Sequence, residues 1–268
     1  DPSCAAWVPI LNTLAGTEKN IGWGGRDPSI AATAWSPEQR KLYQDLGQAI
    51  RAAADQTEPM IRLTTHRVMR QLYEQFIAYS RAFADRIPTY TEPDNALART
   101  FTQASNVLGA ICDAITHGSA AARAPLVPGG AAPDGVAHAG APAIPKPFLS
   151  SPDAVCSDWV TASDQFASDT ADWRQKTDLN IPASQWSPEL KTLNDAVIPT
   201  MRESAATIEE LGRRSENAVL QDLAQLATQY RRAFAEALPT YSTSDKYLYD
   251  AGVYPVGMVR QACEAAGE

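Results

Sequence analysis

Apolar residues recur at helical spacing along most of the chain, and no stretch shows the alternation of a half-buried β-strand. One apolar stripe with positions i, i+4, i+7 and i+11 consists of Leu72, Phe76, Tyr79 and Phe83. A second stripe of the same span consists of Leu223, Leu226, Tyr230 and Phe234. This pattern predicts an all-α fold.

The two stripes belong to an internal duplication. Residues 79–90 match residues 230–241 at an offset of 151, with eight of twelve positions identical. At the same offset, the Trp-Ser-Pro-Glu sequence at 35–38 recurs at 186–189 and Cys112 matches Cys263, whereas Cys4 matches Cys156 at an offset of 152. We therefore expect two helical repeats, residues 1–116 and 153–268, each an up-down bundle of four helices closed by one disulfide.

The helices expected in the first repeat are 4–17, 37–54, 60–86 and 93–115. Those expected in the second are 156–176, 188–206, 218–237 and 245–265. In Trp-Ser-Pro-Glu, Ser36 or Ser187 can cap the helix, and the proline suits the first helical position. Between the first two helices of repeat 1, we interpret Gly22-Trp23-Gly24-Gly25-Arg26 as a tight loop that displays an aromatic side chain.

Residues 117–152 separate the repeats and contain seven prolines with many alanines and glycines. This composition predicts an extended linker with polyproline II character. The alternative is an ordered path, docked onto a repeat by the apolar residues Leu126, Val127, Ile144, Phe148 and Leu149.

Four cysteines allow three pairings. The duplication favours Cys4–Cys112 and Cys156–Cys263, one bond for each repeat. Such bonds persist in periplasmic, secreted or surface proteins, so we expect an extracytoplasmic location. The alternative is four buried free thiols in a cytosolic protein. A zinc site is disfavoured because the chain has no C-x-x-C spacing.

The net charge of −8 argues against nucleic acid and anionic lipid as partners. The copies differ, because residues 1–116 hold 11 basic and 12 acidic residues and residues 156–268 hold 10 basic and 17 acidic residues. The second copy therefore suits a basic partner. No apolar run is long enough for a transmembrane segment. We interpret the abrupt start at Asp1 as that of a processed or shortened chain, from which a signal peptide or anchor could have been removed.

Candidate catalytic chemistry is sparse. The histidines are His66, His117 and His138, and none has a counterpart in the other copy. A nucleophile–histidine site would rest on His66, which we interpret as a solvated residue of the third helix. The acidic pairs Glu209-Glu210 and Asp169/Asp172 are typical of a solvated helix face. The sequence contains no nucleotide-binding, hydrolase or metalloprotease fingerprint, so we assign no catalytic residue, metal or cofactor.

Two sets of residues remain as ligand-binding candidates. Arg81 and Arg232 occupy equivalent positions and could capture an anion or form a structural ion pair. All six tryptophans lie in the first segment of a repeat. They could form an aromatic core in each copy, or line a groove for an apolar or sugar ligand. The groove candidates are Trp23, Trp35, Trp173 and Trp186. Tyr90 and Tyr241 are expected to pack over a turn with a partner for each hydroxyl.

The Ala- and Arg-rich composition, the paired cysteines and the Trp-Ser-Pro-Glu and Pro-Thr-Tyr motifs resemble uncharacterised exported or membrane-anchored proteins of actinobacteria, of the mycobacterial type. This resemblance implies no defined activity and no functional residue. Our leading hypothesis is a non-enzymatic protein of the cell envelope that binds a protein partner or a small apolar ligand. The alternatives are the sensor ectodomain of a membrane-anchored signalling protein, a carrier of an apolar ligand or lipid, and an enzyme.

Overall fold

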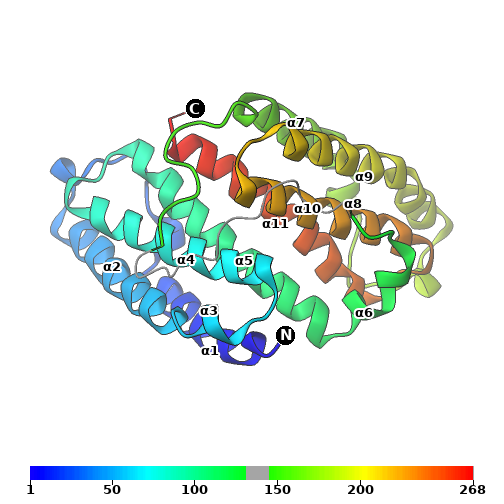
Figure 1. The fold of residues 1–268 in the computed structure, drawn as a ribbon, viewed down its shortest axis with the longest axis horizontal. Helices are drawn as coiled ribbons and strands as arrows, with labels where there is room; N and C mark the ends of the chain where they lie inside the picture. The colour runs from blue at the N-terminus through cyan, green and yellow to red at the C-terminus, as the bar shows by residue number, and fades with distance from the viewer. Residues whose placement is uncertain (131–144, 268) are drawn as a thin grey trace. The chain divides into compact units, whose positions relative to one another are not determined.

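A computed structural model describes residues 1–130 and 145–267, and this part of the chain contains helices and no strand (Figure 1). The prediction of an all-α fold is therefore confirmed. The α-helices are α1 Ser3–Asn20, α2 Pro37–Thr57, α3 Met60–Leu63, α4 Arg67–Arg86, α5 Asn95–Thr116, α6 Ser119–Arg123, α7 Cys156–Asp169, α8 Ala171–Lys176, α9 Pro188–Arg214, α10 Ala218–Ala237 and α11 Lys246–Ala265. The 3-10 helices are η1 Trp23–Gly25, η2 Ala32–Ala34, η3 Ile87–Thr89, η4 Glu92–Asp94, η5 Ala124–Leu126, η6 Ala183–Gln185, η7 Leu238–Thr240 and η8 Thr243–Asp245.

The described residues form two compact units. Unit 1 holds residues 1–109, 145–152 and 261–267, and unit 2 holds residues 110–130 and 153–260. The division into residues 1–116, 117–152 and 153–268 remains a proposal about the evolutionary repeats.

Both Trp-Ser-Pro-Glu motifs start a helix as expected. The Ser36 hydroxyl accepts a hydrogen bond from the Gln39 backbone N–H at 3.2 Å, and the Gln39 side chain accepts one from the Ser36 N–H. In repeat 2, the Ser187 hydroxyl accepts from the Leu190 N–H, also at 3.2 Å. The side chains thus satisfy backbone donors that the first helical turn leaves unpaired.

The prediction of a single helix over residues 60–86 is wrong, because the chain is extended between α3 and α4. Thr64 has ψ 136°, and its hydroxyl accepts a hydrogen bond from the His66 N–H. The same hydroxyl donates to the Asp1 carboxylate at 2.6 Å. His66 is exposed and precedes α4, so it is solvated as expected but is not a helical residue.

Repeat 2 has the same pair of hydrogen bonds at the equivalent positions. The Ser215 hydroxyl donates to the Asp153 carboxylate at 2.7 Å and accepts from the Asn217 N–H. In each copy, an aspartate just before the first helix therefore holds the corner between the second and third long helices. Local propensity does not reveal this corner, because its partner lies about 60 residues away along the chain.

Two other helix limits in repeat 2 differ from expectation. The first helix is not continuous over residues 156–176, because it divides at Thr170 into α7 and α8. Thr170 is fully buried, and its hydroxyl bonds to the Phe166 carbonyl at 2.7 Å. The second helix, α9, continues past residue 206 to Arg214 with Pro199 inside it.

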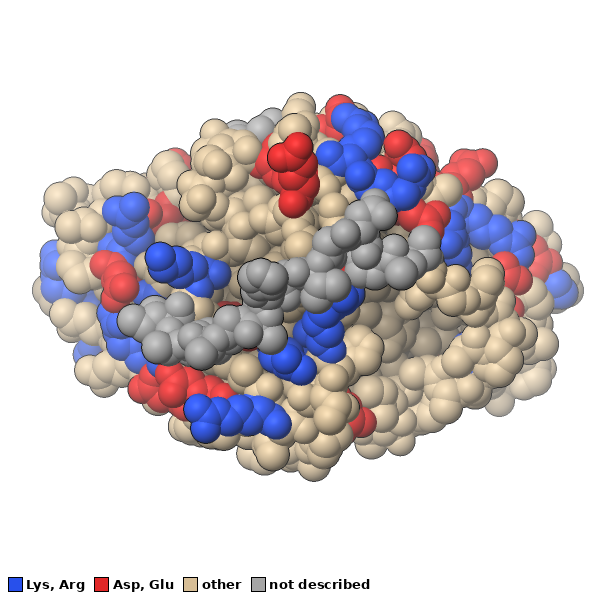
Figure 2. All heavy atoms as spheres, viewed as in Figure 1, with Lys and Arg blue, Asp and Glu red and all other residues tan. Residues whose placement is uncertain are grey.

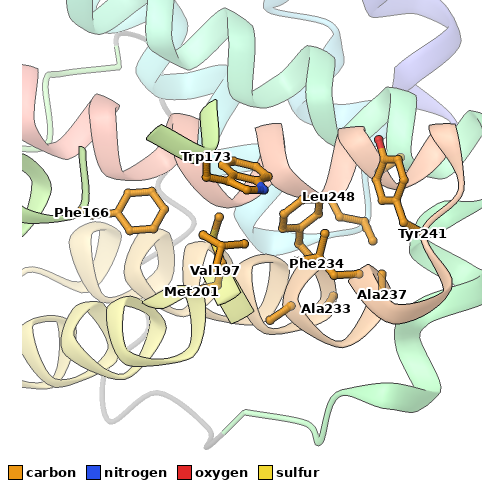
Figure 3. Close-up of a cluster of buried hydrophobic side chains, with 12 residues drawn as sticks. Phe166, Trp173, Val197, Met201, Ala233, Phe234, Ala237, Tyr241 and Leu248 are labelled. Atoms are coloured by element: carbon orange, nitrogen blue, oxygen red, sulfur yellow. The ribbon is translucent and has the colours of Figure 1, made fainter. Parts of the chain in front are cut away.

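The core of unit 2 is aromatic and gathers side chains from several helices (Figure 3). Its members include Phe166, Trp173, Met201, Phe234 and Leu248. The stripe predicted on α10 is partly wrong. Leu223 and Phe234 are buried, but Leu226 and Tyr230 are only half-buried, and Leu220, Ala224 and Ala227 complete the buried face. In unit 1 the predicted stripe on α4 is fully buried at all four positions.

The described cysteines form the two disulfides that the duplication favoured, Cys4–Cys112 and Cys156–Cys263. All four cysteine side chains are buried. The alternative of free thiols is therefore wrong.

The linker is not wholly extended. Residues 119–126 form α6 and η5 and are joined to unit 2, because Arg123 makes a two-pronged contact with the Asp245 carboxylate at 2.7 and 3.1 Å. At the other end, the Phe148 N–H donates to Gln75 on α4 at 2.9 Å, and Leu149 is buried. The described ends of the segment thus follow the ordered path, but Leu126, which was expected to dock, is 46% exposed. Ile144 lies outside the described residues.

We expect Arg123→Ala to lower the free energy of unfolding by about 2–3 kcal/mol, because it leaves the Asp245 carboxylate, 1% exposed, without its cationic partner. Urea unfolding followed by circular dichroism measures the change, and proteolysis within residues 119–127 should become faster. The control is Arg86→Ala, which removes a longer contact, 3.6 Å, between an exposed arginine and Asp94 and should cost less than about 1 kcal/mol. Equal losses in the two variants would contradict the ordered path.

Candidate functional site

The tryptophans of repeat 1 lie inside unit 1. Trp23 and Trp35 are each 7% exposed, and both contact the ring of Tyr43, Trp35 by stacking at 4.0 Å between ring centroids. Trp35 also stacks on Tyr90 at 5.5 Å. The prediction that the glycine-rich loop displays an aromatic side chain is therefore wrong. Gly22 adopts a φ of 73°, which a glycine tolerates, and the chain then turns Trp23 inward.

Arg26 covers the outer face of this aromatic cluster. Its guanidinium carbon lies 3.3 Å from the centroid of Trp23, and the group donates to the Asn95 side chain at 2.6 Å. Burial lowers the pKa of Arg26, whereas burial raises the pKa of nearby Glu18 and the positive charge of Arg26 opposes that rise. Arg26 is the residue of this loop that sequence analysis missed, and its position directly after two glycines was the available signal.

The tryptophans of repeat 2 have similar positions in unit 2. Trp173 is 3% exposed and donates its indole N–H to the Asn194 side chain at 2.9 Å. Figure 3 shows its ring beside Phe234 and above Val197. Trp186 is half-buried and stacks on Tyr241.

Three hydrogen bonds around these rings occur in both copies at an offset of 151. The indole N–H of Trp35 donates to the Ile30 carbonyl, and that of Trp186 donates to the Ile181 carbonyl. The hydroxyls of Tyr90 and Tyr241 donate to the carbonyls of Pro28 and Leu179. The N–H groups of Ala32 and Ala183 donate to the carbonyls of the same two tyrosines. The shared motifs thus hold the loop before the second helix in place. A ligand groove at the four candidate tryptophans remains a prediction.

The two equivalent arginines both form ion pairs with the end of the second helix. Arg81 contacts Asp55 and Glu58 at 2.6 Å each. Arg232 contacts Glu209 at 2.6 Å, and Glu209 is the counterpart of Glu58. An anion at these sites would have to compete with the carboxylates.

Arg231, beside Arg232, is a buried cation that sequence analysis missed. It is 3% exposed, lies with its guanidinium carbon 4.1 Å from the Phe166 ring centroid, and donates to the Gly252 carbonyl and to the Ser204 hydroxyl. Burial lowers its pKa to about 10. A Cβ at Gly252 would lie 2.9 Å from the Arg231 side chain, so the glycine permits the close approach of α10 and α11.

The two histidines that the structure describes lie in different surroundings. His66 is exposed, His117 stacks on Tyr247 at 4.8 Å, and His138 lies outside the described residues. Among residues 1–130 and 145–267, no group of three His, Cys, Asp or Glu side chains could hold a metal ion. None of the described helices is long and apolar enough to cross a membrane.

The clearest difference between the copies is on the outer face of the first helix. In repeat 2, α7 is tied to its neighbours by two interhelical ion pairs, Asp158 with Arg214 and Asp164 with Arg260. The counterparts in repeat 1 are Ala6 with Leu63 and Asn12 with Gly109. Both ion pairs are thus replaced by uncharged residues.

The resulting surface is named here the uncharged α1 face. It consists of the exposed residues Ala5, Val8, Pro9, Asn12 and Thr13 of α1 together with Leu63 of α3, which packs against α1. Val8 is 41% exposed and Leu63 is 44% exposed. No charged residue lies between Pro2 and Thr17. On the face drawn in Figure 2, basic and acidic side chains adjoin one another in several places.

Together these features define a duplicated, disulfide-bonded all-α protein whose aromatic clusters pack inside each unit and whose copies differ at the surface. The chain belongs to the family described as Mycobacterial ESX-1 associated protein, whose model matches residues 1–267. An uncharacterized protein of Mycolicibacterium smegmatis strain MKD8 is 46% identical over 268 residues, which is all of this chain and 71% of that protein. No solved structure matches. The predicted resemblance to mycobacterial proteins is confirmed, and the family indicates a role in the context of the mycobacterial secretion system and envelope.

Proposed function

We propose that this chain is a non-enzymatic, extracytoplasmic protein of the cell envelope that binds a partner protein through the uncharged α1 face. The observation that carries the proposal is the replacement of two ion pairs around α7 by uncharged residues around α1. The two disulfides are consistent with the oxidising compartment that this location requires.

The chemistry of the face specifies the partner. A charged group brought against Val8 or Leu63 would lose water and gain no opposite charge. An apolar and uncharged protein surface would lose little hydration free energy on binding, and the contact would remove exposed hydrocarbon from water. The partner is therefore expected to present such a surface, and this contact should be insensitive to salt.

Substitution at Val8 tests the face. We expect Val8→Lys to weaken binding of the partner at least about tenfold, because the contact loses the burial of one valine and gains a desolvated charge. The measurement is the yield of the partner captured from mycobacterial envelope extract by the purified, oxidised chain at low and at high salt. The matched control is Thr161→Lys, at an exposed position of α7.

Different outcomes favour other surfaces. A partner that is lost at high salt, or lost equally with Thr161→Lys, would contradict the proposal and favour binding of a basic partner by the acidic second copy. A dimer of this chain that Val8→Lys dissociates would identify a second copy as the occupant. A co-purified lipid that Trp186→Ala releases would favour the carrier, and a signalling domain on the longer protein would favour the sensor.

A further inference from the structure

Residues 145–149 lie on α4 in the way that a bound peptide would. The side-chain amide of Gln75 donates to the Lys146 carbonyl at 3.3 Å and accepts from the Phe148 N–H at 2.9 Å. A carbonyl and an N–H two residues apart are the pair that one residue of a parallel β-strand contacts on its neighbour. Gln75 therefore recognises the backbone of this segment, as a neighbouring strand would.

The side chains of the segment add an aromatic and an aliphatic contact. The ring of Phe148 meets the ring of Tyr79, one turn beyond Gln75 on α4, edge-on at 6.0 Å between centroids. Tyr79 is fully buried, and Leu149, which follows Phe148, is 7% exposed. Recognition of the backbone is thus combined with selection of an aromatic residue followed by an aliphatic one.

The helix offers more hydrogen-bonding capacity than the segment uses. Gln71 lies one turn before Gln75 and is 4% exposed, and neither polar atom of its amide has a hydrogen-bond partner. Four residues of a helix advance about 6.0 Å and two residues of an extended chain advance about 6.6 Å. Gln71 is therefore spaced to contact the next backbone pair toward the amino end of an extended occupant, which would satisfy the buried amide.

These glutamines are specific to repeat 1. The equivalents of Gln71 and Gln75 in repeat 2 are Asp222 and Leu226. A leucine side chain can neither donate nor accept a hydrogen bond. The third long helix of repeat 2 thus forms without a glutamine at this position, so the duplicated fold does not require one.

The segment on α4 is itself held by few buried groups. Leu149 is buried, whereas residues 145–148 are half-buried or exposed and form no helix. An irregular segment with one buried side chain opens more readily than the buried helix on which it lies. Residues 145–149 can therefore leave α4 without unfolding the unit.

We propose that Gln71, Gln75 and Tyr79 form a peptide-binding site, named here the Gln75 site, which residues 145–149 occupy in cis and from which they can be displaced. The external ligand is an extended peptide segment in which an aromatic residue precedes an aliphatic residue. The tethered segment has an effective concentration on the order of millimolar, so it masks the site from weak ligands. A partner segment that also satisfies Gln71 displaces it.

Binding of a peptide in trans tests the Gln75 site. The probe is a fluorescein-labelled peptide with the sequence of residues 145–150 preceded by two alanines, and its anisotropy is measured with the full, oxidised chain. Phe148→Ala combined with Leu149→Ala removes the anchors of the resident segment. This released variant should bind the probe at least about tenfold more tightly than the original chain does.

Substitution of the helix then tests recognition. In the released variant, Gln75→Leu, which introduces the residue of repeat 2, should weaken binding of the probe at least about tenfold, because both backbone contacts are lost. The matched control is Gln44→Leu, at an exposed position of α2, which should leave the affinity unchanged. A probe with alanine in place of its phenylalanine should bind as weakly as the Gln75→Leu variant binds the original probe.

A folded released variant that binds the probe no better than the original chain would overturn the proposal, and so would an affinity that Gln75→Leu leaves unchanged. If the released variant does not fold, hydrogen exchange of the original chain decides. A millimolar excess of unlabelled probe should raise the exchange rate of the Phe148 amide at least about threefold, and an unchanged rate would exclude displacement. Val8→Lys should not alter binding of the probe, so this result is separate from that for the uncharged α1 face.

Discussion

Replacing Cys4 and Cys112 together by alanine is expected to lower the free energy of unfolding by about 4–5 kcal/mol. The bond closes a loop of more than 100 residues, from before the second turn of α1 to the end of α5. Its removal increases the conformational freedom of the unfolded chain by an amount that grows with the logarithm of the loop length. Alanine is the suitable replacement because both side chains are buried.

Urea unfolding of the oxidised variant measures this loss, with the variant Cys156→Ala and Cys263→Ala as the matched comparison. The second bond closes a loop of similar length, so the two variants should lose similar amounts. Reductant should destabilise the original chain more than either variant, because each variant has already lost one bond. A loss below about 1 kcal/mol would indicate that the unfolded chain remains compact without the bond.

Trp173→Ala is expected to cost about 4 kcal/mol and therefore distinguishes a core residue from the lining of a groove. The variant removes an indole that packs on Phe234 and Tyr249, and it leaves the fully buried side chain of Asn194 without its donor. A groove residue would instead cost little stability when truncated, because its outer face is already in contact with water.

The measurement is the urea midpoint, combined with a mass-spectrometric comparison of small molecules that co-purify with each variant. Trp23→Ala in unit 1 is the comparison, because it truncates the tryptophan that follows the first helix of repeat 1, and this ring is also buried. Loss of a bound small molecule with less than about 1 kcal/mol of destabilisation would support the groove. A large destabilisation in both variants would support two aromatic cores.

The proposed binding face rests on a difference between the two copies. The uncharged α1 face lies where repeat 1 lacks two ion pairs that repeat 2 has. Repeat 2 supplies the reference, because its equivalent residues show the charged arrangement on the same fold. Shared residues such as Trp35 and Trp186 hold the loop before the second helix of each repeat. The residues that differ between the copies are not needed for these contacts.

Much of this architecture follows from the sequence alone. Helical periodicity, the duplication and the Trp-Ser-Pro-Glu caps depend on residues close in sequence or on simple repetition, so the all-α fold, the helix starts and both disulfide pairings could be predicted. The break at Thr64 could not, because it depends on the distant carboxylate of Asp1, and the order of residues 119–126 depends on the ion pair of Arg123 with Asp245.

The candidate sites were harder to predict for the same reason. Six tryptophans in the first segments are compatible with a core or with a groove, and only the folded chain shows that Trp23 turns inward beneath Arg26. The sequence reveals the excess acidity of the second copy, but the pairing of each charge depends on distances between helices. The sequence by itself thus determined the all-α fold, the two capped helix starts and which cysteines join. Tertiary structure decided which charges are neutralised and which face remains uncharged, because electrostatic and packing energies depend on distances that the order of residues does not specify.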